Sequence, residues 1–143
     1  MRRSMFVLFV VVVLGMLVLT ACGGSAPAAS TTTRPTPPTE YASKTNPSAA
    51  NADALAKGKE QYTAICLACH GERGLGDGPA GSALNPKPGN LEDAVKATND
   101  AYLYWRISEG GAMAPFKSSM PAQKGILKDE QIWQIVSYVK TLK

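Results

Sequence analysis

Apolar residues recur at helical spacing in three stretches of the second half of the chain. The clearest stretch is 129–142, which carries an apolar stripe at positions 132, 135, 136, 139 and 142. Stretches 53–66 and 99–107 show the same spacing, and each begins near an Asn or Asp residue that can cap a helix. No stretch shows the sustained alternation of apolar and polar residues that marks a half-buried strand. The chain is therefore predicted to be all-α.

A fourth apolar stretch, 6–19, follows two arginines near the N-terminus. Its 14 residues are fewer than the ~20 that cross a bilayer, so residues 1–21 are predicted to be an export signal. The signal ends in an L-T-A-C sequence that resembles the bacterial lipobox, in which the cysteine, here Cys22, is acylated and attaches to the membrane. An uncleaved signal anchor is the alternative. Both interpretations place the chain at the outer face of the bacterial cytoplasmic membrane, on the periplasmic or cell-wall side.

Residues 23–50 are rich in Ala, Ser, Thr and Pro and show no apolar periodicity. Such a composition does not form a core, so residues 22–50 are predicted to be a disordered tether that begins with the acylated cysteine. A flexible chain of this length spans roughly 30 Å on average. The folded domain is predicted to occupy residues 51–143.

The segment Cys66-Leu67-Ala68-Cys69-His70 ends the first predicted helix. Two thiols three residues apart and an adjacent imidazole are what covalent attachment of a c-type haem requires. The thiols add to the two vinyl groups of the porphyrin, and the imidazole reaches the iron from the same turn. A structural zinc site needs four ligands, a thioredoxin-like pair needs a βαβ setting, and a disulfide leaves His70 unexplained. One covalently bound haem c is therefore the predicted cofactor.

Residues 71–90 contain six glycines and three prolines and are predicted to form a loop. A loop with so few large side chains does not pack by itself, so we expect it to wrap a bulky apolar group such as haem. Gly58 lies inside the first predicted helix, where Gly costs ~1 kcal/mol relative to Ala. We interpret it as a position at which another helix approaches closely.

The charge of the chain argues against a nucleic-acid partner. The net charge is +4, and without Arg2 and Arg3 there remain 13 basic and 11 acidic residues, a net charge of +2. The two carboxylates of a haem would cancel this excess, so no basic patch is left for nucleic acid. Of the three cysteines, two belong to the haem motif and Cys22 to the lipobox, which leaves no pair for a disulfide.

Together these features resemble the class I cytochromes c, in their bacterial monohaem lipoprotein form. The resemblance covers residues 51–143 and is most specific in the loop 71–80 and in the run 120–133. Gly58 and Tyr138 match the small and aromatic pair at which the first and last helices of that family cross. The resemblance implies a cytochrome c fold, in which a few helices and long loops wrap one covalently bound haem.

The same resemblance bears on the iron ligands. His70 is the only histidine of the chain and is the predicted proximal ligand. By resemblance its second ring nitrogen donates to the backbone carbonyl of Pro79, with Pro86 as the second choice. Met120 is predicted to be the sixth ligand because a proline and then the last helix follow it as in the family. Met113 and an open or lysine-ligated iron are the alternatives.

Further residues near these ligands are candidates for contact with the haem. Trp105, with two neighbouring tyrosines, is a candidate hydrogen-bond donor to a haem carboxylate, and core packing is the alternative interpretation. Gln123 stands where the family often has an aromatic residue after the Met-Pro pair. Lys117, Lys124 and Lys128 either ring an exposed haem edge or form an ordinary solvated face.

An iron with both axial positions filled has no place for a substrate or dioxygen, so ligation by His70 and Met120 favours one-electron transfer. We therefore expect an electron carrier rather than an enzyme, with no small-molecule substrate. Its expected partners are respiratory or photosynthetic redox complexes in the same membrane. The alternatives are a haem enzyme or gas-binding protein with an open sixth position, and a fixed cytochrome subunit of a larger oxidoreductase.

Overall fold

The computed structural model describes residues 34–49 and 51–143, which belong to one structural unit, Arg34–Lys143. The predicted export signal, Cys22 and the first part of the predicted tether lie outside the described residues. None of the helices in the described part is both long enough and apolar enough to cross a membrane.

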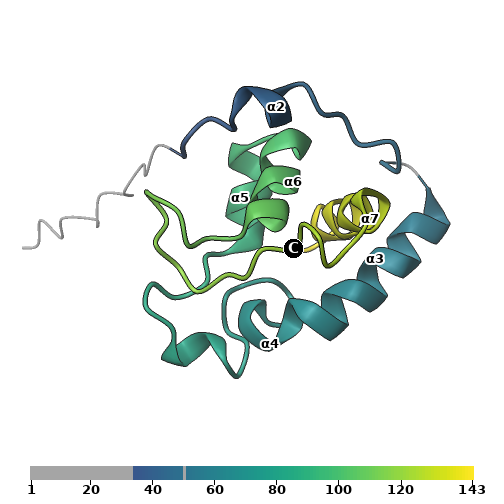
Figure 1. Ribbon diagram of the computed structural model, residues 1–143. Coiled ribbons are helices and arrows are strands. Elements are labelled where there is room, and N and C mark those ends of the chain that lie inside the picture. The colour runs from purple at the N-terminus through teal and green to yellow at the C-terminus, as the bar shows by residue number, and fades with distance from the viewer. Residues whose placement is uncertain (1–33, 50) are drawn as a thin grey trace, which may run out of the picture. The chain divides into compact units, whose positions relative to one another are not determined.

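The described residues form helices and connecting loops, with no strand apart from one isolated bridge between Lys124 and Leu127. This confirms the prediction of an all-α fold. In chain order the elements (Figure 1) are α2 (Thr39–Ala42), α3 (Ala52–Ile65), α4 (Leu67–His70), the 3₁₀ helix η1 (Gly81–Ala83), α5 (Leu91–Ala97), α6 (Asp100–Glu109) and α7 (Asp129–Val139).

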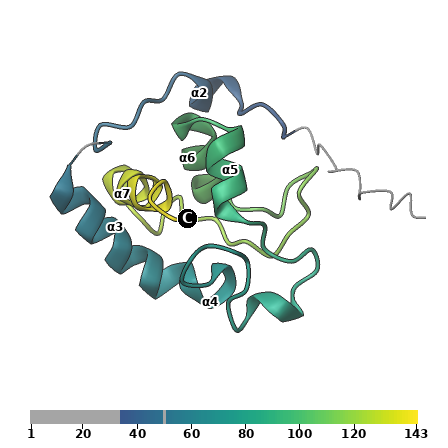
Figure 2. The ribbon, with the colours of Figure 1, turned by 180° about the vertical axis from the view of Figure 1, so that it is seen from behind.

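Helices α3 and α7 pack closely together, and they lie side by side in both views (Figures 1 and 2). Helix α3 begins where Asn51 accepts hydrogen bonds from the backbone N–H groups of Asp53 and Ala54 at 2.9 and 3.1 Å. A Cβ atom built on Gly58 would lie 2.0 Å from the carbonyl oxygen of Gln134 in α7. The prediction that Gly58 marks a close helix approach is therefore confirmed, and Tyr138 lies at the same crossing.

Helix α6 supplies most of the aromatic core. Its N-terminal cap is Asn99, whose side chain accepts from the backbone N–H of Tyr102 at 2.9 Å, and Gly110 ends it with a φ of 68°. Tyr104 stacks on Trp133 of α7 with 4.2 Å between the ring centroids. Both rings are buried, so α6 and α7 are joined through a core that requires no further side chain at that point.

Helix α5 was not predicted from the sequence. It is a short helix of 7 residues, and its cap is Asn90, whose side chain accepts from the backbone N–H of Glu92 at 2.8 Å. Only Ala94 among its residues is buried, so no apolar stripe of the required length marks it in the sequence.

Residues 34–49, which we call the strap, correct the predicted boundary of the tether. The whole of 22–50 was predicted to be disordered, but the strap packs on the helical domain and includes the short helix α2 (Figure 1). Tyr41 is 4% exposed and belongs to the hydrophobic core, with its ring 6.1 Å from that of Tyr104. One buried aromatic residue therefore docks a stretch whose composition is otherwise typical of disorder.

Polar contacts fix the strap on both sides of α2. The hydroxyl of Tyr41 donates to the carboxylate of Glu109, which also pairs with Lys124 at 2.9 Å. Beyond the helix, the side-chain amide of Asn46 donates to the hydroxyl of Ser137 in α7 at 3.0 Å. The N-terminal part of the predicted tether, residues 22–33, lies outside the described residues.

Candidate cofactor site

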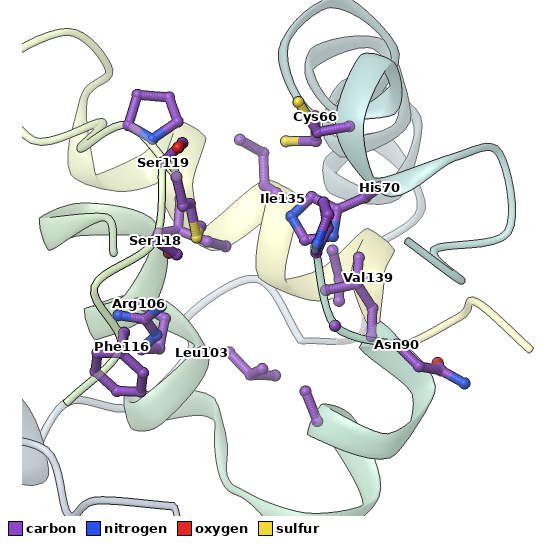
Figure 3. Close-up of a pocket in the computed structure, with 18 of the residues that line it drawn as sticks. Cys66, His70, Asn90, Leu103, Arg106, Phe116, Ser118, Ser119, Ile135 and Val139 are labelled. Carbon is purple, nitrogen blue, oxygen red and sulfur yellow. The ribbon is translucent and has the colours of Figure 1, made fainter. Parts of the chain in front are cut away.

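The Cys66–His70 segment forms one helical turn at the end of α3. The chain turns at Cys66 and continues as α4, with the His70 N–H donating to the carbonyl of Cys66 at 2.9 Å. On a helical turn, residues three and four positions apart lie on one face. The two thiols and the imidazole therefore project from the same side of α4, into a cavity whose walls carry Cys66 and His70 in Figure 3.

The cavity has a volume of about 300 Å³ and lies between α4, α6, α7 and the loops 84–91 and 116–121. Ser118 and Ser119 lie across it from Cys66 and His70, and Ile135 of α7 lies between the two sides (Figure 3). Side chains from segments far apart in the sequence thus enclose one space. The predicted residues that line it are Cys66, Cys69, His70 and Met120.

Two of the predicted site residues do not line the cavity. Pro79 is exposed, and the loop residues that face the cavity come later, from Leu84 to Asn90. Trp105 is 6% exposed and packs edge-on against Tyr102 and Phe116, with ring centroids 5.7 and 5.6 Å away. For Trp105 the core-packing interpretation therefore has the structural support.

The first half of the glycine-rich loop packs on α4 itself. The Ala80 N–H donates to the carbonyl of Ala68 at 2.8 Å, and a Cβ on Gly78 or Gly81 would lie within 2.5 Å of carbonyl oxygens of α4. Glycines are thus needed here because the backbone of the loop touches the backbone of α4. The expected wrapping of a bulky apolar group is restricted to the later part of the loop.

The surroundings of His70 differ from the expected ones. Its Nδ1 atom is buried and has no hydrogen-bond partner, and Pro79 does not approach it. Burial lowers the pKa of His70, whereas an interaction with the backbone of Gly89 acts in the opposite direction. The candidate acceptor for the second ring nitrogen is therefore Gly89, which lines the cavity, rather than Pro79.

The structure separates the two candidate methionines. Met120 lines the cavity, whereas Met113 does not, and the Met113 sulfur instead accepts a contact from the Arg106 guanidinium at 3.7 Å. The loop that carries both residues is closed at its base, because the Gly111 N–H donates to the carbonyl of Met120 at 2.9 Å and the Ser118 N–H donates back to Gly111 at 2.8 Å.

Gln123 has a role that its departure from the family pattern did not suggest. It is 6% exposed, it lines the cavity, and its backbone N–H donates to the carbonyls of Ile107 and Ser108 at 3.1 and 3.0 Å. These bonds attach the segment after Met120 to the end of α6. An aromatic side chain at this position is therefore not required to hold the segment in place.

Charged residues that line the cavity were missed in the sequence. They are all cationic, Arg34, Lys87 and Arg106, and no Asp or Glu lines the cavity among the described residues. Arg106 occurs within a predicted helix, but nothing in the sequence indicates which way Arg34 or Lys87 faces. The three lysines predicted near the ligand segment do not line the cavity, and Lys124 is paired with Glu109.

The residues of the cavity fit a haem c better than they fit a metal ion or a redox dithiol. Cys66 and Cys69 form no disulfide, and burial followed by the proximity of Cys69 raises the pKa of the Cys66 thiol to about 11. Redox-active cysteine pairs instead have lowered thiol pKa values. No group of three Cys, His, Asp or Glu in the described residues is arranged to hold a bare metal ion. A largely apolar cavity with two thiols, one imidazole and only cationic charges suits an apolar ring that carries carboxylates.

Comparison with known proteins gives one match. A family model described as Cytochrome c matches residues 55–143, which is most of the described part of the chain. A search of curated proteins finds no match. The matched residues include the haem motif, Met120 and α7, and they begin after the strap.

Proposed function

The chain belongs to the cytochrome c family, whose members carry electrons on covalently bound haem c, and we propose that it is an exported monohaem carrier tethered to a membrane. The family membership makes the protein an electron carrier rather than an enzyme and gives it redox proteins as partners. The residue roles, the tether and the location given below are parts of the proposal.

Cys66 and Cys69 attach the cofactor in this proposal. Each thiol adds its sulfur and its hydrogen across one vinyl double bond of the porphyrin, so the attachment releases no leaving group and needs no oxidant. The conformation of α4 supports this role, because the two cysteines and His70 project from one face of a single turn into one cavity.

His70 and Met120 are the proposed axial ligands. When bound, a haem iron with imidazole and thioether ligands accepts and releases single electrons, and the thioether raises its reduction potential. The role of His70 is to supply a buried imidazole from a helical turn, and the role of Met120 is to supply the sulfur from the loop across the cavity. The observation that carries the proposal is that these residues, 50 positions apart in the sequence, line the same cavity.

The tether part of the proposal rests on Cys22 and the apolar stretch before it. Acylated Cys22 would hold the domain at the outer face of the bacterial cytoplasmic membrane, next to respiratory or photosynthetic complexes. Because the strap is packed on the domain, only residues 22–33 are left as a spacer, and twelve peptide steps reach at most about 40 Å. Tethering within this reach keeps the effective concentration of the carrier near its partners high.

This short reach also favours a second candidate, a cytochrome subunit fixed in a larger oxidoreductase. A domain whose strap is docked explores a smaller volume than one on a free tether of 29 residues. Extraction of the native membrane in mild detergent followed by gel filtration distinguishes the two. A carrier elutes at the size of the monomer in its detergent micelle, whereas a subunit elutes with other chains at a fixed ratio.

The test of the haem assignment is the absorption spectrum of the protein purified from cells that mature c-type cytochromes. We expect a haem that stays on the chain after denaturation, and its loss when Cys66 and Cys69 are both replaced by Ser. A colourless but folded wild-type protein would contradict the proposal.

Carbon monoxide tests the sixth ligand, because it binds ferrous haem where an axial position is open. We expect the reduced wild-type protein and the Met113→Ala variant to bind it poorly and Met120→Ala to bind it readily. Ready binding by the wild type would instead support the gas-binding or enzymatic alternative. Equal effects of the two substitutions would contradict the assignment of Met120.

A further inference from the structure

Arg34 is the first described residue of the strap and lines the cavity on which the proposed function rests. It precedes the residues that match the family, which begin at position 55. Its presence at the cavity therefore comes from the strap of this chain and not from the cytochrome domain. This raises the question of what a guanidinium contributes at that place.

The contacts of the strap hold its path across the domain. Tyr41 is buried against Tyr104 and donates to Glu109, and Lys44 lies over the ring of Tyr104 at 5.1 Å from its centroid. Between Arg34 and α2 the chain contains three prolines, which restrict the backbone because each fixes φ. The position of Arg34 is therefore set by a docked and stiff segment.

Arg106 is the second guanidinium at the cavity, and it is held in place by its neighbours. Its guanidinium carbon lies 3.4 Å from the ring centroid of Phe116, and one Nη1 hydrogen is donated to the carbonyl of Gly110 at 2.5 Å. In Figure 3 Arg106 and Phe116 lie on the side of the cavity away from Cys66. Stacking fixes the plane of the guanidinium while leaving other N–H groups to bind a ligand.

The two guanidiniums lie close enough to disfavour each other. Burial lowers the pKa of Arg106, and the charge of Arg34 lowers it further, while only Tyr102 acts in the opposite direction. The other titratable groups that line the cavity are Tyr62, the two cysteines, His70 and Lys87, and none is a carboxylic acid. Two cations that converge on a cavity without a counterion are unfavourable unless the occupant of the cavity is an anion.

We propose that Arg34 and Arg106 together bind the carboxylate groups of the haem, so that the strap completes the cofactor site. The inference rests on the proposed function, because haem is the occupant that brings carboxylates to this cavity. The planar guanidinium matches a carboxylate in a two-point hydrogen-bonded pair. Arg34 is thus a positioning residue for the cofactor, supplied from outside the cytochrome domain.

Two measurable effects follow from a guanidinium beside a haem carboxylate. A cation near the iron disfavours the more positive, ferric state, so its removal should lower the reduction potential. A cation beside a carboxylate lowers the pKa of that carboxylate. Its removal should therefore move the pH at which the reduction potential begins to change toward neutral values.

The experiment compares three full-length haem-loaded variants by redox titration between pH 4 and pH 9. Arg34→Gln and Arg106→Gln should each lower the reduction potential and move its pH inflection upward. Arg73→Gln, an exposed residue that does not line the cavity, is the matched control and should leave both unchanged. Arg34 is exposed, so its replacement is not expected to prevent folding.

A second variant tests whether the strap delivers Arg34. Replacing Tyr41 by Ala removes the buried anchor of the strap and should lower the reduction potential as Arg34→Gln does. The double variant should show no further change, because the guanidinium would already have left the cavity. Additive effects of the two substitutions would contradict delivery by the strap.

The failure of this inference is distinguishable from the failure of the proposed function. A protein without haem contradicts the proposed function. A haem protein with a normal spectrum, in which Arg34→Gln and Arg73→Gln give the same potential and the same pH inflection, contradicts only the role of Arg34.

Discussion

The two walls of the cavity are built in different ways. The motif wall, residues 62–71, consists of the end of α3 and α4, and its bonds are those of a helix plus a 2.6 Å hydrogen bond from the Tyr62 hydroxyl to the Gly71 carbonyl. The ligand wall, residues 110–124, is a loop that backbone bonds close on itself and attach to the end of α6. One wall is rigid because helices pack behind it, and the other depends on bonds between distant residues.

This difference divides the proposed work of the site. The motif wall would carry the covalent bonds and the proximal imidazole, and it rests on the crossing of α3 and α7. The ligand wall would carry the exchangeable sulfur ligand on the less supported side. We expect damage to the motif wall to unfold the domain and damage to the ligand wall to act locally.

The largest effect is expected at the support of the motif wall. Gly58→Val places side-chain atoms where the carbonyl oxygen of Gln134 lies 2.0 Å from an ideal Cβ, so α3 and α7 must separate. We expect a loss of about 3 kcal/mol of unfolding free energy, which lowers the Tm by roughly 15 °C for a domain of this size. Thermal unfolding followed by circular dichroism measures it.

Ala56→Val is the matched control for this substitution. Ala56 lies in the same helix and is exposed, so the variant carries the cost of a β-branched side chain in a helix without the collision. Equal Tm values for the two variants would show that the close crossing contributes nothing to the support of the motif wall.

A smaller effect is expected within the motif wall. Tyr62 is 1% exposed, and Tyr62→Phe removes its hydrogen bond to Gly71 while keeping the ring in the core. The Gly71 carbonyl still accepts from the Gly74 N–H at 3.2 Å, so the expected cost is about 1 kcal/mol. Urea unfolding measures it, with Tyr138→Phe on the opposite ring, 5.3 Å away, as the control. A Tyr62→Phe variant as stable as the control would contradict this account.

Much of the fold was predictable because its signals are local. The boundaries of α3 and α6 were predicted to within two residues, since Asn51 and Asn99 cap them and Gly110 ends α6. The apolar stripe of α7 was also correct, although the helix ends at Val139 rather than at 142. Local chemistry was sufficient wherever a helix has a cap and a stripe.

The parts that were missed depend on contacts between distant residues. Tyr41 looks like any residue of a low-complexity stretch until Tyr104 and Glu109 are placed beside it. The predicted role of Pro79 failed for a similar reason, because the chain doubles back on α4 before it reaches the cavity at Leu84. Neither the path of the strap nor that of the loop is encoded in the spacing of residues along the sequence.

The smallest effect is expected where an ion pair attaches the ligand wall to α6. A hydrogen bond from Tyr41, followed by one from Lys124, holds the pKa of Glu109 below its ordinary value of 4.5. A lowered pKa in the folded state stabilises the protein above that ordinary value, and the contribution disappears as the pH falls through the lowered one. In urea unfolding, Glu109→Gln should therefore be slightly less stable than the wild type at pH 7 and equally stable near pH 3. Glu60→Gln, an exposed residue of α3, should show no such convergence. A Glu109→Gln variant that matches the wild type at both pH values would mean that only backbone bonds hold the ligand wall, which sharpens its contrast with the motif wall.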